Sequence, residues 1–329
     1  MCLLLLTKLF HIRLKVKPKV LIAETGDFNS DVLNMLKQSC EVTFENLSKE
    51  DLKTALREYD VIWFRLGYKI DKKVLEGDLK CKVLVSPVTG IDHIDEELCK
   101  LKGIEIISLK GEVDFLRKVR ATAELSIGFA ITLMRKIIPA SLSVVEGKWN
   151  RDDFRGNEIF EKTVGIVGMG RLGSIVADYY KAFGAKVFGY DIADFGNDVQ
   201  KIDNLEDLIK VSDIVSVHVS HYMNENMFGK KEFELFKKNA ILVNTSRGNV
   251  MDEEALLEAL IKGKLRGAAL DVLKKESEIT SENPLIKYAK ANSNLIILPH
   301  IGGNTYESFE KTERFVAEKL INRINSTLV

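Results

Sequence analysis

The sequence predicts an α/β protein built from two doubly wound parallel-sheet domains. From Lys19 onward, short apolar runs alternate with segments of helical periodicity, and strands separated by helices form parallel sheets. A glycine-rich turn follows the first strand of the second series. The length of 329 residues is sufficient for two hydrophobic cores.

The composition is that of an ordinary soluble globular protein, with 46% hydrophobic and 29% charged residues. The formal net charge is zero, so bulk electrostatics favour neither nucleic acid nor a membrane surface as a partner. The four cysteines are scattered, without a C-x-x-C pair. We therefore expect reduced thiols, a cytoplasmic location and no metal site.

The first ten residues are apolar, but they lack the basic start and the small-residue cleavage site of a signal peptide. We expect a leader or a misassigned start instead. The apolar run 125–134 has ten residues, too few to cross a bilayer. We expect this run to form a buried or subunit-interface helix.

The first domain is predicted to be a small flavodoxin-like unit that begins with residues 17–120. Helices are expected at 30–38 and 49–58. Apolar runs predict five strands, at 20–23, 42–44, 61–64, 82–85 and 104–107. A long helix then begins at Ala121 and is interrupted or ends around Pro139.

The second domain is predicted over residues 121–303. Six apolar runs start about 23 to 28 residues apart, at 163–167, 186–190, 213–217, 240–244, 268–271 and 294–298. This period equals one strand plus one helix, and six such units complete a Rossmann dinucleotide-binding sheet. The amphipathic segment 304–329 is expected to cross back to the first domain, which would then comprise 17–120 and 304–329. Two chain crossings would form a hinge beside an interdomain cleft.

The turn after the first Rossmann strand has the spacing G-x-G-x-x-G, at Gly168, Gly170 and Gly173. We expect these glycines, in order, to permit a tight turn, to let the backbone approach a pyrophosphate, and to let helix pack on strand. Asp191 follows the next strand, 18 positions after Gly173. A carboxylate there binds the ribose hydroxyls and repels a 2′-phosphate, which favours NAD over NADP. A strand that ends in a solvated Asp is the alternative.

Polar side chains follow five predicted strands at the carboxyl edge of the Rossmann sheet, where open parallel sheets bind ligands. Arg247 can hold a carboxylate by two parallel hydrogen bonds, and a surface Arg with a local partner is the alternative. His300 can move a hydroxyl proton near neutral pH, and a satisfied core imidazole is the alternative. Glu276, Glu278 and Glu282 are candidates for orienting this imidazole, and spacing alone does not choose among them. The polar set is Asp191, His218, Thr245–Gly248, Asp271 and His300–Gly303.

These residues resemble the D-isomer-specific 2-hydroxyacid dehydrogenases, and within them the D-3-phosphoglycerate dehydrogenase branch without its C-terminal regulatory domain. The likeness runs from about Lys19 to the C-terminus and keeps the family's order of motifs. It rests on Thr89–Asp95, Ala121–Glu124, Gly168–Gly173, Asn244–Gly248, Ala269–Val272 and Pro299–Gly303.

The resemblance implies hydride transfer between NAD and C2 of a small D-2-hydroxy acid or 2-keto acid. Arg247 would bind the substrate carboxylate and carbonyl, His300 would be the acid/base, and Glu276 would pair with it. Asp271 would meet the nicotinamide amide. A homodimer through the helix 121–138 is also implied. An NAD(H)-sensing, corepressor-like binding protein on the same fold is the alternative function.

Two further sets of residues would surround the ligands. The backbone of Val88, Thr89 and Gly90 would cradle the substrate carboxylate together with Arg247. Arg65, after the third strand of the first domain, is a candidate contact for an anionic or polar substituent, with a solvated Arg as the alternative. The cofactor set is Thr122, Gly168, Gly170, Arg171, Leu172, Gly173, Asp191, His218, Val219, Ser220, Thr245, Ser246, Asp271, His300, Gly302 and Gly303.

The sequence departs from the family's usual pattern in several places. Ser277 replaces a proline after the catalytic Glu, which keeps Glu278 open as the partner of His300. Ser220 replaces the proline of the usual His-x-Pro motif, whose histidine is His218. Residues 221–223 are larger than the residues that are common at these positions. Pro87 and Val88 replace smaller residues, which would stiffen the substrate loop.

Overall fold

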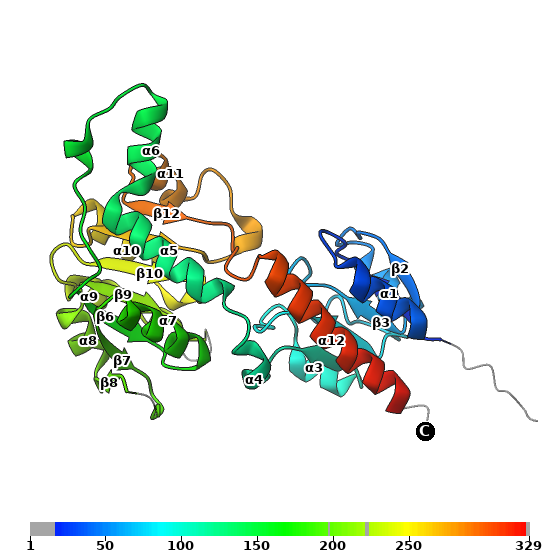
Figure 1. The fold of residues 1–329 in the computed structure, drawn as a ribbon. Helices are drawn as coiled ribbons and strands as arrows, with labels where there is room; N and C mark the ends of the chain where they lie inside the picture. The colour runs from blue at the N-terminus through cyan, green and yellow to red at the C-terminus, as the bar shows by residue number, and fades with distance from the viewer. Residues whose placement is uncertain (1–16, 197, 221–223, 327–329) are drawn as a thin grey trace, which may run out of the picture. The chain divides into compact units, whose positions relative to one another are not determined.

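The computed structural model describes residues 17–196, 198–220 and 224–326. The expectations for the first ten residues and for residues 221–223 lie outside these ranges. The chain divides into two compact units (Figure 1): the first runs to Glu112 and resumes at Phe309, and the second spans Val113–Ser308. The sequence placed the two boundaries at 120/121 and 303/304.

The first unit contains a five-stranded parallel sheet in the order β2-β1-β3-β4-β5. Helices α1 (Ser30–Ser39), α2 (Leu52–Glu58) and α3 (Glu96–Leu101) connect its strands. Asn29 and Asp95 cap α1 and α3 by accepting backbone N–H groups, which helix starts otherwise leave unpaired. The five predicted strands are confirmed, as β1 Lys19–Ile22, β2 Glu41–Phe44, β3 Val61–Trp63, β4 Val83–Ser86 and β5 Glu105–Ser108.

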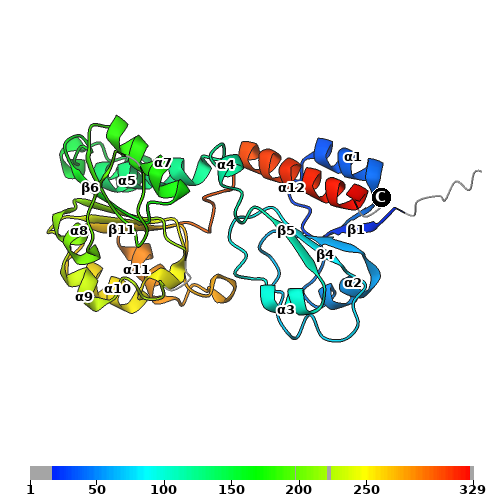
Figure 2. The same cartoon turned by 90° about the horizontal axis from the view of Figure 1, so that it is seen from below.

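The last helix, α12 (Tyr306–Ser326), belongs to the first unit from Phe309 onward and lies beside α1 in two views (Figures 1 and 2). Its inward face buries Val316, Ala317 and Leu320 completely. Glu313 on the same face accepts the backbone N–H of Asn29 at 2.9 Å. The predicted amphipathic helix is present, and its apolar face is buried.

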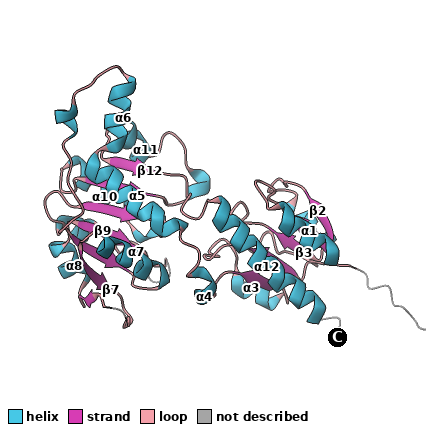
Figure 3. Ribbon diagram, viewed as in Figure 1, coloured by secondary structure: helices cyan, strands magenta, loops and turns pink. Residues whose placement is uncertain are grey.

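The second unit contains a seven-stranded parallel sheet in the order β12-β11-β10-β9-β6-β7-β8, drawn in magenta in Figure 3. Six of its strands match the predicted runs. The count of six was wrong by one, because β8 has only two polar residues at the sheet edge and no apolar run marks it. The strands are β6 Thr163–Val167, β7 Lys186–Tyr190, β8 Gln200–Lys201, β9 Ile214–Val217, β10 Ile241–Asn244, β11 Gly267–Leu270 and β12 Leu295–Ile297.

Helices cover both faces of this sheet. Successive side chains of a strand point to opposite faces, so each strand contributes apolar side chains to a core on either side. On β10, Leu242 packs in a core with α8, α9, α10 and α11, whereas Ile241 and Val243 pack in a second core with α5 and α7. The helices are α4 Val113–Leu116, α5 Ala121–Arg135, α6 Ile137–Val145, α7 Arg171–Ala182, α8 Leu205–Val211, α9 Lys230–Glu234, α10 Glu253–Ile261 and α11 Pro284–Ala291, with 3-10 turns at η1 Arg151–Phe154, η2 Gly248–Val250 and η3 Glu276–Glu278.

The long helix predicted from Ala121 is divided into α5 and α6. Lys136 between them is left-handed, with φ 54°. Pro139 lies in the first turn of α6, where a missing N–H is tolerated, whereas in one continuous helix its ring would clash with the Arg135 carbonyl. The predicted break is confirmed, and it falls at Lys136, shortly before the proline.

The two helices differ in burial. Most apolar side chains of α5 are buried within the second unit, whereas no residue of α6 is buried. The exposed apolar surface therefore lies on α6 and does not extend along the whole helix 121–138 that was predicted as the dimer contact. Its exposed side chains are Ile137, Ile138, Leu142, Val144 and Val145. Within the described ranges no single helix could span a membrane; α5 and α6 reach that length and composition only together, with a bend of 63°.

Candidate active site

The glycine turn after β6 has the geometry that a dinucleotide phosphate needs. Gly168 has a φ of 92°, and a Cβ there would lie 2.8 Å from the backbone nitrogen of Val219, so only glycine fits. A Cβ on Gly170 would meet no atom within 4 Å, which leaves space over the start of α7. A Cβ on Gly173 would collide with the Gly168 carbonyl, so this glycine lets the helix pack on the turn.

The first residues of α7, Arg171 and Leu172, bring backbone N–H groups to this open helix start. The side chain of Arg171 is engaged elsewhere, because Nη1 donates to the Leu116 carbonyl at 3.0 Å. Burial, and secondly the charge of Arg120, lower the pKa of the Arg171 guanidinium. Leu172 packs against the second unit's core. Both residues therefore remain cofactor candidates through their backbone.

Asp191 lies beside the glycine turn. Its Oδ2 accepts the Met169 N–H at 2.7 Å and its Oδ1 accepts the Ala193 N–H at 3.0 Å. Each carboxylate oxygen can accept more than one hydrogen bond, so ribose hydroxyls can still bind here. The carboxylate is thus fixed where it would meet a ribose and repel a 2′-phosphate.

His218 forms the wall behind the turn, but its imidazole points into the protein. The ring Nε2 lies 2.8 Å from the Ser216 hydroxyl, and burial lowers the pKa of His218 to about 3. The ring is therefore neutral near pH 7, with a proton on one of its two nitrogens. Its Nδ1 is buried and has no hydrogen-bond partner among the described residues. Val219 and exposed Ser220 continue the wall.

Threonines and serines lie between α5 and the strand ends. Thr245 Oγ1 hydrogen-bonds the buried Ser126 hydroxyl at 2.9 Å, and the Ser246 N–H donates to Asn244 Oδ1 at 2.9 Å. A Cβ on Gly302 would lie 3.1 Å from Thr122 Cγ2. Ser126 was not predicted, although its four-residue spacing from Thr122 places both on one face of α5.

Asp271, after β11, holds the turn that carries His300. Its carbonyl accepts the His300 N–H at 2.8 Å, and its carboxylate accepts the N–H groups of Ile301 at 2.8 Å and Gly302 at 2.7 Å. Burial raises the pKa of the Asp271 carboxyl, and these two N–H groups oppose the rise. The three bonds hold His300 left-handed, with φ 54°, a conformation that costs a non-glycine residue roughly 1–2 kcal/mol.

Glu276 is the carboxylate that meets His300. Its Oε2 lies 2.8 Å from His300 Nδ1. Glu278 instead lies 3.9 Å from Lys275 Nζ, and Glu282 pairs with Lys287 at 2.6 Å. The structure thereby distinguishes the three acids that spacing left open. Ser277 lies between Glu276 and Glu278 in the short turn η3, so proline is not needed there to present Glu276.

Arg247 follows β10, which lies next to β11 in the sheet, and β12 is the next strand. The carboxyl ends that lead to Arg247, Asp271 and His300 are therefore consecutive. A Cβ on Gly248 would collide with the Leu273 backbone, so the loop that continues to Glu276 packs directly beside the arginine. One arginine Nη1 bond goes to the Ser246 carbonyl at 2.8 Å.

The first unit's candidates follow β3 and β4. The Val88 N–H donates to the Ser86 carbonyl at 2.8 Å, so this one of the three predicted backbone donors already has a partner within the first unit. Arg65 directs its guanidinium to Glu313 of α12. Glu313 was missed as a partner, although its spacing from Phe309, Val316 and Leu320 on one helix face was a signal of burial.

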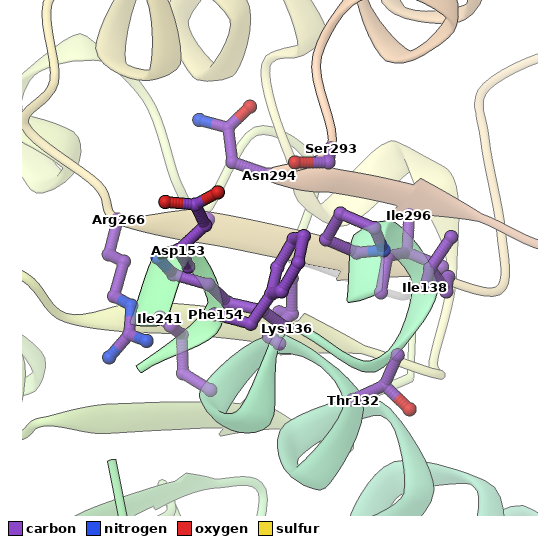
Figure 4. Close-up of a pocket in the computed structure, with 13 residues that line it drawn as sticks. Thr132, Lys136, Ile138, Asp153, Phe154, Ile241, Arg266, Ser293, Asn294 and Ile296 are labelled. Atoms are coloured by element: carbon purple, nitrogen blue, oxygen red, sulfur yellow. Dashed lines mark hydrogen bonds between the residues drawn. The ribbon is translucent and has the colours of Figure 1, made fainter. Parts of the chain in front are cut away.

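A cavity of about 230 Å³ lies at the opposite, amino edge of the second sheet (Figure 4). Its two cations have protein partners: Lys136 Nζ donates to the Asp153 carbonyl at 3.1 Å, and Arg266 Nη2 to the Met134 carbonyl at 3.1 Å. It contains none of the predicted site residues. Across the described part of the chain, no cluster of three or more His, Cys, Asp or Glu side chains could hold a metal ion.

The residues present fit NAD. Gly168 and Gly170 give a cradle that a Cβ would close or narrow, the start of α7 presents N–H groups, and Asp191 supplies a fixed carboxylate. Phosphates bind such helix starts because the N–H groups and the helix dipole both favour negative charge. The groups suited to bind the phosphates and the ribose of NAD therefore all lie in the second unit.

Comparison with known proteins agrees with this fit. Residues 127–302 match the family described as D-isomer specific 2-hydroxyacid dehydrogenase, NAD binding domain. The chain is 35% identical over 309 residues to D-3-phosphoglycerate dehydrogenase of Methanocaldococcus jannaschii, covering 92% of this chain and 57% of that protein. It is 32% identical over 314 residues to hydroxypyruvate reductase of Thermotoga maritima, covering 93% and 98%.

The fold agrees as well. A crystal structure of D-lactate dehydrogenase from Aquifex aeolicus, complexed with NAD and lactic acid, matches with a TM-score of 0.83 and 25% identity over 94% of this chain and 96% of that one. The chain spans only about half the length of the phosphoglycerate dehydrogenase relatives, but nearly all of the hydroxypyruvate reductase. Because these relatives are dehydrogenases and reductases, an NAD(H) sensor is not favoured. The chain belongs to the D-isomer-specific 2-hydroxyacid dehydrogenases, a family of NAD-dependent oxidoreductases.

Proposed function

We propose that the chain interconverts a small 2-keto acid and the matching D-2-hydroxy acid, with the chemistry at the carboxyl edge of the second unit's sheet. The observation that carries this proposal is the His300–Glu276 pair, set on a turn that Asp271 holds by three hydrogen bonds. NADH, when bound, supplies a hydride for C2 of the keto acid.

His300 is proposed to donate the proton that the substrate oxygen needs. Because Glu276 holds Nδ1, the other ring nitrogen, Nε2, is left to exchange a proton with substrate. A hydride at C2 and a proton at oxygen together complete the hydroxy acid. In the opposite direction, His300 accepts the hydroxyl proton.

Arg247 is proposed to bind the substrate carboxylate and to compensate the negative charge that grows on the carbonyl oxygen. A guanidinium suits this role because its planar fork can form two parallel hydrogen bonds with a carboxylate.

The test is NADH oxidation with glyoxylate, pyruvate and hydroxypyruvate as substrates. The wild-type protein should turn over at least one of them, and Arg247→Ala should lower kcat/KM by about 100-fold or more, as loss of a charged hydrogen-bond partner predicts. Arg155→Ala is the matched control, since Arg155 makes an exposed pair with Asp152. Unchanged kinetics of Arg247→Ala would refute its role, and tight NADH binding without turnover would favour a sensor.

We also propose a homodimer that uses α6. This helix exposes five apolar side chains, and Trp149 just beyond it is 87% exposed; apolar surface of this kind marks protein contacts. Leu142→Glu should convert a dimer to a monomer in light scattering after gel filtration. A monomeric wild-type protein would refute the proposal.

A cytoplasmic location is proposed from the thiols. Cys40, Cys81 and Cys99 are free and buried, and burial raises their pKa values to about 11, 12 and 11. Thiols of this kind suit a reducing compartment. Fractionation of the source cells, with detection of the protein by antibody, checks this location.

A further inference from the structure

The loop that carries Glu276 leaves the core just before Lys274. Leu273 is still buried, whereas the Glu276 side chain is 41% exposed. Among the described residues, the turn that follows is held by bonds within the turn itself and by the contact of Glu276 with the imidazole. One such bond runs from the Glu278 N–H to the Lys275 carbonyl, at 2.8 Å. The position of Glu276 therefore depends on what holds Lys274.

Three neighbours in the second unit hold Lys274. Its N–H donates to Glu253 Oε1 at 2.6 Å, and its Nζ donates to Asn226 Oδ1 at 2.6 Å. A Cβ on Gly248 would collide with the Lys274 nitrogen, so the two backbones pack directly on each other. Lys274 is thus fixed both at its backbone and at its side chain.

Glu253 is the acidic member of this set. It lies in the first turn of α10, directly after the capping residue Asp252, and it is half-buried. Burial raises the pKa of the Glu253 carboxyl, while the N–H and the charge of Lys274 oppose the rise. Glu254 lies in the same turn and is exposed. Both acids suit the positive end of the helix dipole, and the contact with the Lys274 backbone distinguishes Glu253.

The same anchor lies between two loops of the candidate site. Gly248 directly follows Arg247, and Lys274 precedes Glu276 by two residues. Because Lys274 packs on Gly248, a group that holds Lys274 fixes the loop of the carboxylate against the loop of the guanidinium. All of these residues belong to the second unit.

We propose that Glu253 is a positioning residue: by accepting the Lys274 N–H, it keeps Glu276 within hydrogen-bond reach of His300. A carboxylate orients an imidazole only at hydrogen-bond distance, which is 2.8 Å here. A displacement of about 1 Å near a reacting group can lower a rate by about 100-fold. This inference rests on the proposed function, because it requires His300 as the group that moves the proton.

The kinetic test uses NADH and whichever of glyoxylate, pyruvate and hydroxypyruvate the wild-type protein reduces fastest. Glu253→Ala should lower kcat about tenfold and change KM less. Glu253→Gln should keep most of kcat, because an amide oxygen can still accept the Lys274 N–H. Glu254→Ala is the matched control from the same helix turn, and its kcat should equal that of the wild type.

Three kinetic outcomes would contradict parts of this account. A rise in KM alone for Glu253→Ala would overturn the inference and leave the proposed function intact. An equal loss of kcat in Glu253→Gln and Glu253→Ala would overturn the role of the hydrogen bond to Lys274. No turnover of any of the three keto acids by the wild-type protein would overturn both the inference and the proposed function.

A double-mutant cycle tests whether Glu253 acts through Glu276. In the Glu276→Gln background the orienting carboxylate is already lost, so adding Glu253→Ala should lower kcat at most about twofold. A merely structural role of Glu253 would give the same loss in both backgrounds. That result would overturn the inference.

Hydrogen–deuterium exchange of the protein without substrate gives a measure that does not depend on activity. Glu253→Ala should exchange faster than Glu254→Ala in peptides that cover residues 273–279, because this loop loses its anchor. Equal exchange in the two variants would overturn the inference. Should Glu253→Ala not fold, Lys274→Met removes the bond to Asn226, and it should raise exchange in the same peptides and lower kcat. Wild-type exchange and kcat in folded Lys274→Met would overturn the role of Lys274 as the anchor, and the inference with it.

Discussion

The two parallel sheets of this molecule end in different chemistry. At the carboxyl edge of the second unit, Asp271 holds a turn, and the turn presents His300 to Glu276 with a side chain that is 28% exposed. At the carboxyl edge of the first unit, Arg65 is tied to a fully buried Glu313. One edge presents a partly exposed imidazole, and at the other a guanidinium is paired with a buried carboxylate.

Two sheets of the same architecture thus differ in the side chains that follow their strands and in how exposed these side chains are. Both sheets are parallel and doubly wound, so both collect side chains at one edge. The two edges differ in what packs beside them: in the second unit a loop whose partly exposed Glu276 pairs with His300, and in the first unit α12 with the buried Glu313. The fold alone does not predict which chemical groups lie at each sheet edge.

The largest expected effect concerns the exposed imidazole. His300→Asn keeps a polar side chain but removes the proton donor, so kcat should fall about 10²- to 10⁴-fold, the usual range for general acid–base catalysis. NADH affinity, measured by fluorescence titration, should change little. A wild-type kcat in this variant would show that another group donates the proton.

The next effect concerns the first unit. Glu313→Ala leaves the Arg65 guanidinium largely buried without a carboxylate, and breaking such a pair costs about 3–5 kcal/mol. Urea unfolding, followed by circular dichroism, should show this loss. Lys319→Met, which breaks a partly exposed pair of the same helix with Glu112, should cost at most about 1 kcal/mol. Equal losses in the two variants would contradict the special status of Glu313.

A smaller effect is expected at Asp271. Asp271→Asn replaces one of the two oxygens that accept N–H groups from Ile301 and Gly302, and an unsatisfied buried donor costs about 1–3 kcal/mol. Because the lost bond loosens the His300 turn, kcat should fall about tenfold or more, while hydroxypyruvate KM changes less. A rise in KM alone would show that Asp271 acts on binding and not on the position of His300.

The smallest effect is a pH dependence of stability. Burial lowers the pKa of His218 from the ordinary 6.5 to about 3, so between these values only the unfolded chain binds this proton. The contribution of the neutral His218 side chain to the free energy of unfolding is complete above pH 6.5. Below this value it falls as pH decreases, by about 1.4 kcal/mol per pH unit. Between pH 7 and pH 5, His218→Leu should therefore lose about 2 kcal/mol less unfolding free energy than wild type. Equal losses would show that the folded imidazole is charged.

Much of the fold followed from local patterns. Every strand with an apolar run was found, because short apolar runs between turns are the sequence signal of a strand. β8 was missed, because two polar residues at a sheet edge leave no pattern. The break at Lys136 was found through Pro139, but its exact position depends on where the chain adopts a left-handed residue, which sequence alone does not show.

Less of the candidate site could be predicted from the sequence. Spacing selected Arg247 and His300 but left three acids open, because loops after strands can direct any of them inward. The structure shows that Glu276 meets the imidazole. Arg65 was taken as a candidate contact for a polar substituent, and its burial by Glu313 became visible only when α12 was placed on the first unit. Contacts between residues 248 positions apart leave no local signal.

We propose that His300, held by Asp271 and Glu276, transfers the proton in an NADH-dependent reduction. The most direct test is the rate of NADH oxidation with hydroxypyruvate and glyoxylate, for the wild-type protein, His300→Asn and Arg155→Ala at equal NADH saturation. We expect turnover in the wild type and the control, and a loss of at least about 100-fold in His300→Asn. Full turnover in His300→Asn, or none in the wild-type protein with NADH bound, would contradict it.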